Sequence, residues 1–248
     1  MNKLPVLLCL LAAMAAVLKA AALPTVERRV CSSGFAPGGI FRVELTVELE
    51  SHELPGAFVI SEDWPAGVQM LDSYWQGKRF MPVQRGNCFS WLFGYGEGNP
   101  QCSSGRLSCV IAVPDECNPS EIRVFGKVCI AGAEAEITGD SVLERIGEGE
   151  LPRVEWLELP KGWSLHLMPF HCNAAQGELA GDGACFTLGS GMAWVQVADN
   201  VIPPGKPFWL WRREPDFLLL TEDQSAVGTG VSYDNLTDLY EKMLPWRN

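Results

Sequence analysis

The chain has 248 residues, with 19 lysines and arginines against 30 aspartates and glutamates, and its formal charge is −11. A negative surface repels a phosphate backbone and an anionic membrane, so the composition argues against nucleic acid as a partner. The length can hold one large all-β domain or two smaller ones, each with a core of its own.

The first 22 residues have the composition of an export signal. Lys3 precedes an apolar run from Leu4 to Leu18, and three alanines ending at Ala22 supply the small residues that a signal peptidase requires. The run is shorter than the roughly 20 apolar residues that span a bilayer. We therefore expect residues 1–22 to be a signal peptide, and the mature protein to be secreted or at the cell surface with no membrane span.

Residues 23–146 are predicted to form an antiparallel β-sandwich, because short apolar runs alternate with glycine and proline turns. In the first run, Val43, Leu45, Val47 and Leu49 alternate with polar residues, which predicts a strand with one exposed face. No segment before residue 140 has helical periodicity. Further strands are predicted over Ala57 to Ile60, Phe89 to Phe93, Leu107 to Val113 and Ile122 to Ile130.

A linker rich in glycine and glutamate, residues 147–152, separates this segment from a second, small β-rich domain at 153–248. Near the end of the chain, Tyr233, Leu236, Tyr240 and Met243 follow helical spacing, which predicts a short C-terminal helix. The predicted fold class is therefore all-β with one terminal helix. The strands predicted in the second domain are Val154 to Leu159, Trp163 to Met168, Ala193 to Val197 and Phe208 to Arg212.

Eight cysteines remain after the signal peptide, an even number that predicts disulfide bonds in an exported chain. Zinc is the alternative, but the chain has no Cys-x-x-Cys pair and its spacings match no common zinc site. Cys172 is predicted to pair with Cys185. The other six are left in unknown pairing, since six cysteines allow 15 connectivities: Cys31, Cys88, Cys102, Cys109, Cys117 and Cys129.

Both segments resemble modules of bacterial secreted proteins. The first carries Ser33-Gly34-Phe35-Ala36-Pro37-Gly38-Gly39 and Ser61-Glu62-Asp63-Trp64-Pro65-Ala66-Gly67, and resembles immunoglobulin-like β-sandwich modules. The second carries Gly162-Trp163-Ser164-Leu165 and Gly205-Lys206-Pro207-Phe208-Trp209. It resembles a small β-module with a Gly-Trp-Asn-Leu opening and a Gly-Lys-Gly-Tyr-Trp closing, although Ser164 and Pro207 depart from that pattern. The resemblance implies a fold and no reactive groups.

No catalytic, metal or cofactor site is predicted. A hydrolase triad needs a histidine, and His52, His166 and His171 stand in no recognisable nucleophile setting. Gly189-Ser190-Gly191 lacks the Gly-x-Ser-x-Gly frame of a nucleophile elbow. A cleft that joins His166 or His171 to a carboxylate would nevertheless favour a secreted hydrolase, the third interpretation.

The candidate binding residues are aromatic. The chain has nine tryptophans, and exposed aromatic rings stack on sugars, whereas small β-domains usually bury them. Trp75 in a polar loop and Trp211 beside two arginines are the candidates for exposed rings, and Tyr95 belongs to a glycine-rich loop suited to protein contacts. The sequence therefore predicts a non-catalytic extracellular binding or structural module whose partner is a protein or a glycan. The alternative is a carbohydrate-binding accessory module.

Overall fold

The computed structural model describes residues 23–49, 56–94, 98–130, 132–170, 172, 179–180, 183–188, 194–196, 202 and 204–224. Within them it contains nineteen strands and one 3-10 helix, η1 (Glu148–Glu150). The first nine strands are β1 (Thr25–Val30), β2 (Ile40–Glu48), β3 (Ala57–Asp63), β4 (Gln69–Trp75), β5 (Lys78–Arg79), β6 (Val83–Arg85), β7 (Cys88–Gly94), β8 (Gly105–Ala112) and β9 (Glu121–Arg123). The next five are β10 (Phe125–Ile130), β11 (Ala133–Glu136), β12 (Thr138–Gly139), β13 (Val142–Glu144) and β14 (Val154–Leu159). The last five are β15 (Gly162–Leu167), β16 (Ala184–Leu188), β17 (Trp194–Gln196), β18 (Pro207–Arg212) and β19 (Asp216–Thr221).

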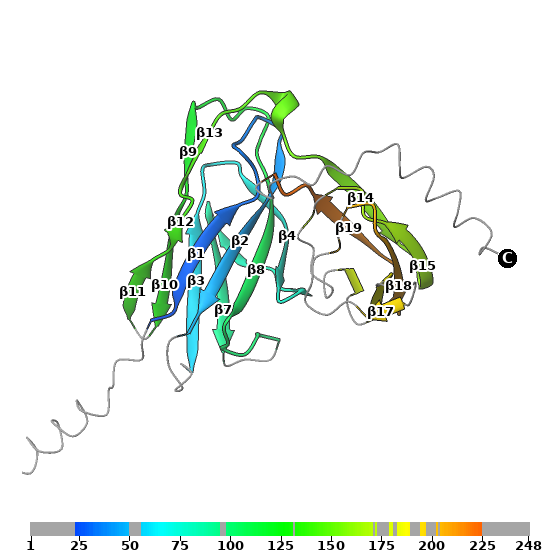
Figure 1. The fold of residues 1–248 in the computed structure, drawn as a ribbon. Helices are drawn as coiled ribbons and strands as arrows, with labels where there is room; N and C mark the ends of the chain where they lie inside the picture. Colours follow the sequence, from blue (N-terminus) through cyan, green and yellow to red (C-terminus); the bar gives the residue numbers. More distant parts are fainter. Residues whose placement is uncertain are drawn as a thin grey trace, which may run out of the picture.

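Two large sheets and the two-stranded ribbon of β9 and β13 make up the sandwich, here defined as β1 to β13 (Figure 1). One sheet has the order β12-β1-β2-β8-β4-β5 and the other β11-β10-β3-β7-β6. All pairings are antiparallel except that of β1 with β12. Alternate residues of each strand point inward, as in β3, where Phe58 and Ile60 are buried. The predicted antiparallel two-sheet arrangement is confirmed.

The sandwich core is mainly apolar and encloses a buried ion pair. Arg28 Nε lies 2.7 Å from Glu62 Oε1, and both side chains are fully buried. Arg28 also donates to the carbonyls of Val124 and Asp140. A Cβ at Gly126 would lie 2.6 Å from Arg28 Nη2, so the guanidinium occupies the space beside this glycine.

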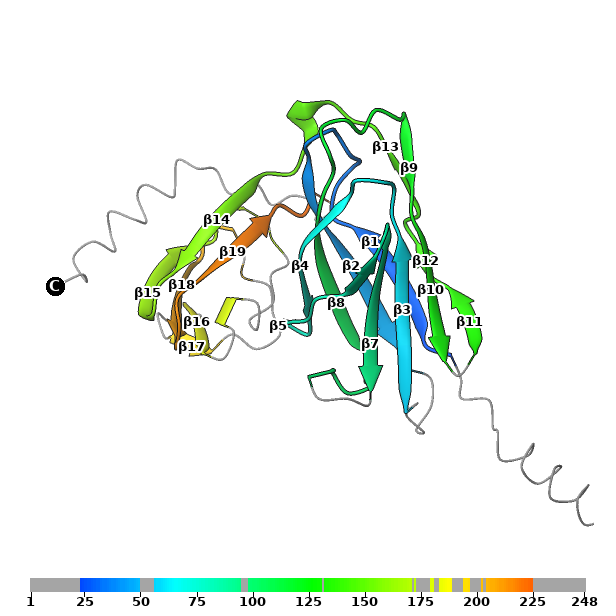
Figure 2. The same cartoon turned by 180° about the vertical axis from the view of Figure 1, so that it is seen from behind.

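The remaining strands, β14 to β19, are here called the C-terminal unit. β14 pairs with β19 in a two-stranded ribbon, and the other four form a sheet with the order β15-β18-β16-β17. Figure 2 shows the two sheets of this unit side by side, with β15 at its outer margin. Its core is a second apolar cluster built from residues such as Phe208, Leu210 and Leu218, and Tyr74 of the sandwich belongs to it.

A polar seam joins the C-terminal unit to the outer face of the β1–β2 sheet. Arg29 Nη2 lies 2.7 Å from Glu44 and 3.0 Å from Asp223, which is buried. Gln224 donates from its backbone to the carbonyl of Cys31 and from its side chain to that of Glu150. The Val43 strand was predicted to expose its polar face, and this holds for Thr46 and Glu48, which are exposed. Glu44 on the same face is buried instead, because its carboxylate lies at the seam, 2.7 Å from Arg29.

The all-β prediction is confirmed for the described part of the chain. The signal peptide and the predicted C-terminal helix lie outside the described residues. The immunoglobulin-like assignment and the division at residues 147–152 stay predictions, although η1 occupies this stretch and the two apolar clusters lie on either side of it in sequence apart from Tyr74.

Candidate binding surface

The four-stranded sheet of the C-terminal unit places its aromatic residues on one face. In the register, Trp209 of β18 lies opposite both Leu165 of β15 and Phe186 of β16, and Trp211 lies opposite Trp163. Side chains directly opposite each other in an antiparallel pair share a face. Trp194 of β17 extends this face, because it lies opposite Leu188, two residues along β16 from Phe186. We call this surface the aromatic face: Trp163, Leu165, Phe186, Trp194, Trp209 and Trp211.

The rings of the aromatic face pack on one another and stay open to solvent. Trp209 is central, with ring centroids 6.4 Å from Trp163 and 6.1 Å from Trp194, both near edge-to-face at 83° and 75°. Trp163 also contacts Phe186 at 5.9 Å. Trp163 is 59% exposed and Trp194 is 43% exposed. These two rings therefore leave much of their apolar area in water, whereas a buried aromatic ring would remove it.

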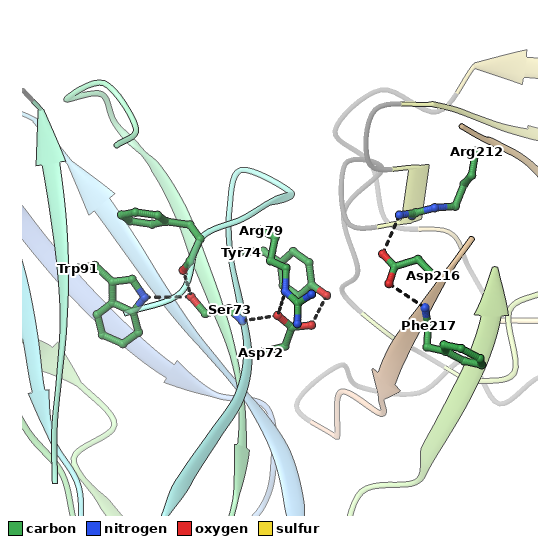
Figure 3. A network of polar contacts seen from close by, with 9 residues as sticks. Asp72, Ser73, Tyr74, Arg79, Trp91, Arg212, Asp216 and Phe217 are labelled. Atoms are coloured by element: carbon green, nitrogen blue, oxygen red, sulfur yellow. Dashed lines mark hydrogen bonds and ion pairs between the residues drawn. The ribbon is translucent and has the colours of Figure 1, made fainter. Parts of the chain in front are cut away.

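The aromatic face has no charged residue among the four strands. Their one charged residue is Arg212, which alternates to the opposite, core-facing side with Leu210 and Phe208. Arg212 donates to the carbonyl of Leu179 and to Asp216, whose other oxygen accepts the backbone N–H of Phe217 (Figure 3). This arrangement keeps the guanidinium away from the tryptophans, and the face stays neutral on a chain of charge −11.

The structure places the three predicted binding residues differently. Trp75 was predicted in an exposed loop, which is wrong: it ends β4, is 5% exposed, and packs edge-to-face on Phe93 with centroids 4.7 Å apart. Its ring therefore fills the sandwich core and cannot stack on a ligand. Trp211 is half-buried on the aromatic face. Tyr95 lies outside the described residues.

A second tryptophan shows why the sandwich rings are structural. Trp91 is fully buried, and its indole N–H donates to the hydroxyl of Ser73 at 2.9 Å. Ser73 in turn donates to the carbonyl of Phe80, and neighbouring Asp72 accepts from Tyr74 and Arg79 (Figure 3). A buried indole needs a partner for its N–H, and this network supplies one.

The cysteines are distributed over separate layers. Cys88 and Cys129 are half-buried on the outer face of the five-stranded sheet, opposite Asp63 and Val59 of β3. With β3 between them and an offset of four residues, their Cα atoms are about 16 Å apart, well beyond the roughly 7 Å that a disulfide spans. These two thiols therefore cannot pair with each other in this fold.

The predicted Cys172–Cys185 bond is not formed in this structure, since Cys185 carries a free thiol. Both residues are nevertheless fully buried in the same apolar cluster. Burial raises the pKa of Cys185 to about 12, so its reduced form is a neutral thiol at physiological pH. The pairing stays a prediction.

One histidine lies near a hydroxyl. His166 Nε2 and Ser164 Oγ are 2.7 Å apart, both on β15, and burial lowers the pKa of His166 below 6.5. The ring stacks on Phe208. A triad also needs a carboxylate that orients the histidine and donors for an oxyanion. The described contacts of His166 provide the serine and the aromatic ring alone, and His171 lies outside the described residues.

Among the described residues, no group of three or more potential ligands is arranged to hold a metal ion. The same part of the chain contains no helix that is long and apolar enough to cross a membrane.

Sequence reasoning selected Trp211, which lies on this face, and did not select Trp163, Trp194 or Trp209. The alternation of Trp163 with Leu165 carried a usable signal for Trp163. Trp194 could not be placed without the register of β17 on β16, which the local sequence does not indicate.

No family model matches the sequence, and neither does any curated protein. Among solved structures, domains D2 and D3 of the major pilin SpaD from Corynebacterium diphtheriae are 12% identical, with 80% of this chain and 76% of that chain covered and a TM-score of 0.37. A cohesin in a cohesin–dockerin complex from Clostridium thermocellum is 10% identical, covering 49% of this chain and 99% of that one, with a TM-score of 0.34.

The collagen-binding subdomain of the Enterococcus faecalis surface protein ACE is 9% identical, over 51% of this chain and 99% of that one, with a TM-score of 0.32. At this degree of overlap the likeness assigns no family, and the Gly-Trp-Asn-Leu type of module stays a resemblance.

Proposed function

We propose that this protein is an exported, non-catalytic binding module that contacts a protein partner through the aromatic face of its C-terminal unit. The single observation that carries the proposal is the cluster of Trp163, Trp194 and Trp209 on a neutral sheet face. Exposed apolar patches on soluble proteins mark interaction sites, and tryptophan is enriched among the residues that dominate binding energy.

The geometry of the rings favours a protein over a glycan. Sugars stack on open, flat ring faces and need polar groups that accept and donate hydrogen bonds. Here the rings are inclined to each other by 45° to 83°, and Gln196 is the one polar side chain of the four strands that alternates onto this side. Interlocked edges and faces instead complement apolar side chains. Carbohydrate binding is the alternative outcome of the test below.

The export proposal rests on the sequence of residues 1–22. If the mature protein acts outside the cell, its partner is an extracellular protein. A module held by two apolar cores and a polar seam presents the aromatic face on strands, which fix side-chain positions more firmly than loops do.

The test compares two substitutions on the aromatic face with a matched control. Immobilised peptide and glycan panels are probed with the purified protein and with Trp163→Ala, Trp194→Ala and Trp156→Ala. Trp156 is 64% exposed on β14, outside the four-stranded sheet, so its loss removes a similar ring from a different surface. We expect peptide hits that weaken at least about tenfold in the first two variants and stay unchanged in the control.

Glycan hits that weaken in Trp163→Ala and Trp194→Ala would show that the aromatic face binds carbohydrate and not protein. Hits that respond equally to Trp156→Ala, or to none of the three substitutions, would show that the aromatic face is not the contact surface.

A further inference from the structure

The aromatic face ends at an open sheet edge. β15 has one strand neighbour, β18, among the described residues, and no residue of β15 is fully buried. Figure 1 and Figure 2 both place β15 at the margin of the C-terminal unit. The backbone of six consecutive residues, Gly162–Leu167, therefore has one side of its N–H and C=O groups directed away from the sheet.

β15 lacks the devices that normally prevent pairing at a free edge. Natural edge strands are short or carry charged residues or proline. The edges of the two sandwich sheets follow this rule: β5 is Lys78–Arg79, β6 ends in Arg85, β11 contains two glutamates, and β12 has two residues. β15 reads Gly-Trp-Ser-Leu-His-Leu, with no charge, no proline and six residues. Burial lowers the pKa of its histidine, which disfavours a positive charge on this strand.

We infer that β15 takes up an extended segment of the partner protein by backbone pairing, so that the partner adds a fifth strand beside the aromatic face. This inference rests on the proposed function and names the form of its partner. In such strand addition the backbone hydrogen bonds give affinity, and pockets for alternate side chains give specificity.

The two sides of β15 set different requirements for alternate residues of the incoming segment. On one side the added strand continues the row of Trp163 and Leu165, which selects large apolar residues. On the other side it lies beside Ser164 and His166, whose side chains bond to each other and suit small hydroxyl residues. A chain of charge −11 disfavours an acidic segment. The partner segment is therefore an alternating apolar and hydroxyl sequence that is neutral or basic.

The probe is a synthetic, fluorescein-labelled peptide of alternating valine and threonine flanked by lysines, about nine residues long to match a typical strand. Two further versions carry N-methyl groups on alternate residues, one on the valines and one on the threonines. Successive N–H groups of an extended strand point to opposite edges, so each version blocks one edge and leaves every side chain in place. Fluorescence anisotropy measures binding to the purified protein.

We expect the parent peptide to bind, one methylated version to bind at least about tenfold more weakly, and the other to stay within about threefold of the parent. On the protein, Leu165→Lys places a charge on the free strand and should weaken the parent peptide, whereas Val154→Lys on β14 should not. Because Leu165→Lys can disturb folding, near-ultraviolet circular dichroism checks each variant, and the methylated peptides test the inference on the unmodified protein.

The outcomes separate the two proposals. If both methylated versions bind like the parent but Trp163→Ala weakens all three, the aromatic face binds and strand addition is wrong. If the parent peptide does not bind below about 1 mM, strand addition is likewise overturned. A concentration-dependent dimer that Leu165→Lys dissociates would show that the edge pairs two copies of this chain instead.

Discussion

Removing one partner of the buried Arg28–Glu62 pair should destabilise the sandwich far more than the loss of an exposed ion pair would. The pair is 2.7 Å apart with both side chains at 0% exposure. Breaking a buried pair leaves an uncompensated charge, which costs about 3–5 kcal/mol. We therefore expect Arg28→Met and Glu62→Leu each to lower the free energy of unfolding by about 4 kcal/mol.

The double variant should be more stable than either single variant. The double variant buries no charge, and its remaining cost is the loss of three hydrogen bonds to neutral groups. Two of them join Arg28 to the carbonyls of Val124 and Asp140. The third joins the indole N–H of Trp64 to Glu62 Oε2 at 3.2 Å. At about 1 kcal/mol for each lost hydrogen bond, the double variant should lose about 3 kcal/mol, against a sum of about 8 for the two single changes.

Urea unfolding followed by tryptophan fluorescence measures all three variants, since Trp64 and Trp91 report from the sandwich core. The control is Arg123→Met, which breaks an ion pair to Glu121 whose side chains are 60% and 44% exposed and which should cost about 0–1 kcal/mol. If the double variant loses as much free energy of unfolding as the two single variants together, the reasoning is refuted. Additive losses would mean that neither buried charge is compensated by the other.

Three further predictions concern the C-terminal unit and the seam. Burial lowers the pKa of His166 from 6.5 in the folded protein, so the unfolded chain binds a proton more readily at this residue. The free energy of unfolding should therefore fall as the pH drops below about 6.5. The urea midpoint of His166→Asn should depend less on pH than that of the parent protein. If the predicted Cys172–Cys185 bond forms in the oxidised protein, alkylation after denaturation without reduction should leave both residues unlabelled, and Cys185→Ser should cost about 3 kcal/mol in thermal or urea unfolding, the value for a loop of about 15 residues. Asp223→Asn removes the negative charge that Arg29 contacts at the seam, and should lower stability by about 1–2 kcal/mol and speed hydrogen exchange near Cys31.

The strands could be predicted from sequence wherever the alternating apolar residues are also the buried ones. Phe89 to Phe93 and Leu107 to Val113 correspond closely to β7 and β8, because inward residues on one face there are apolar. β4 was missed, since its residues Gln69 to Ser73 are mostly polar and their burial comes from strands distant in sequence. Local sequence does not record which neighbour covers a face.

The same limit explains the errors at the candidate site. Trp75 follows a polar stretch yet packs in the core, because β4 turns it toward Phe93 of the other sheet. Glu44 is expected to face solvent by alternation, but it is buried at the seam, where Arg29 bonds both Glu44 and Asp223. Conversely, Trp194 is 43% exposed although tryptophans in small β-domains are usually buried. Exposure depends on sheet order, and a pattern with period two carries no information about order.

The seam also determines how the molecule would carry mechanical load. Gln224 bonds to the carbonyl of Cys31, next to the end of β1, while Leu23 precedes the start of the same strand. A pull between residues 23 and 224 therefore runs along β1 and loads its six-residue register with β2 in shear. Ladder hydrogen bonds lie perpendicular to the strands, so tension along β1 strains them together and does not open them one after another. The attachment that closes the C-terminal unit onto the sandwich thus directs tension along the strongest direction of the sheet.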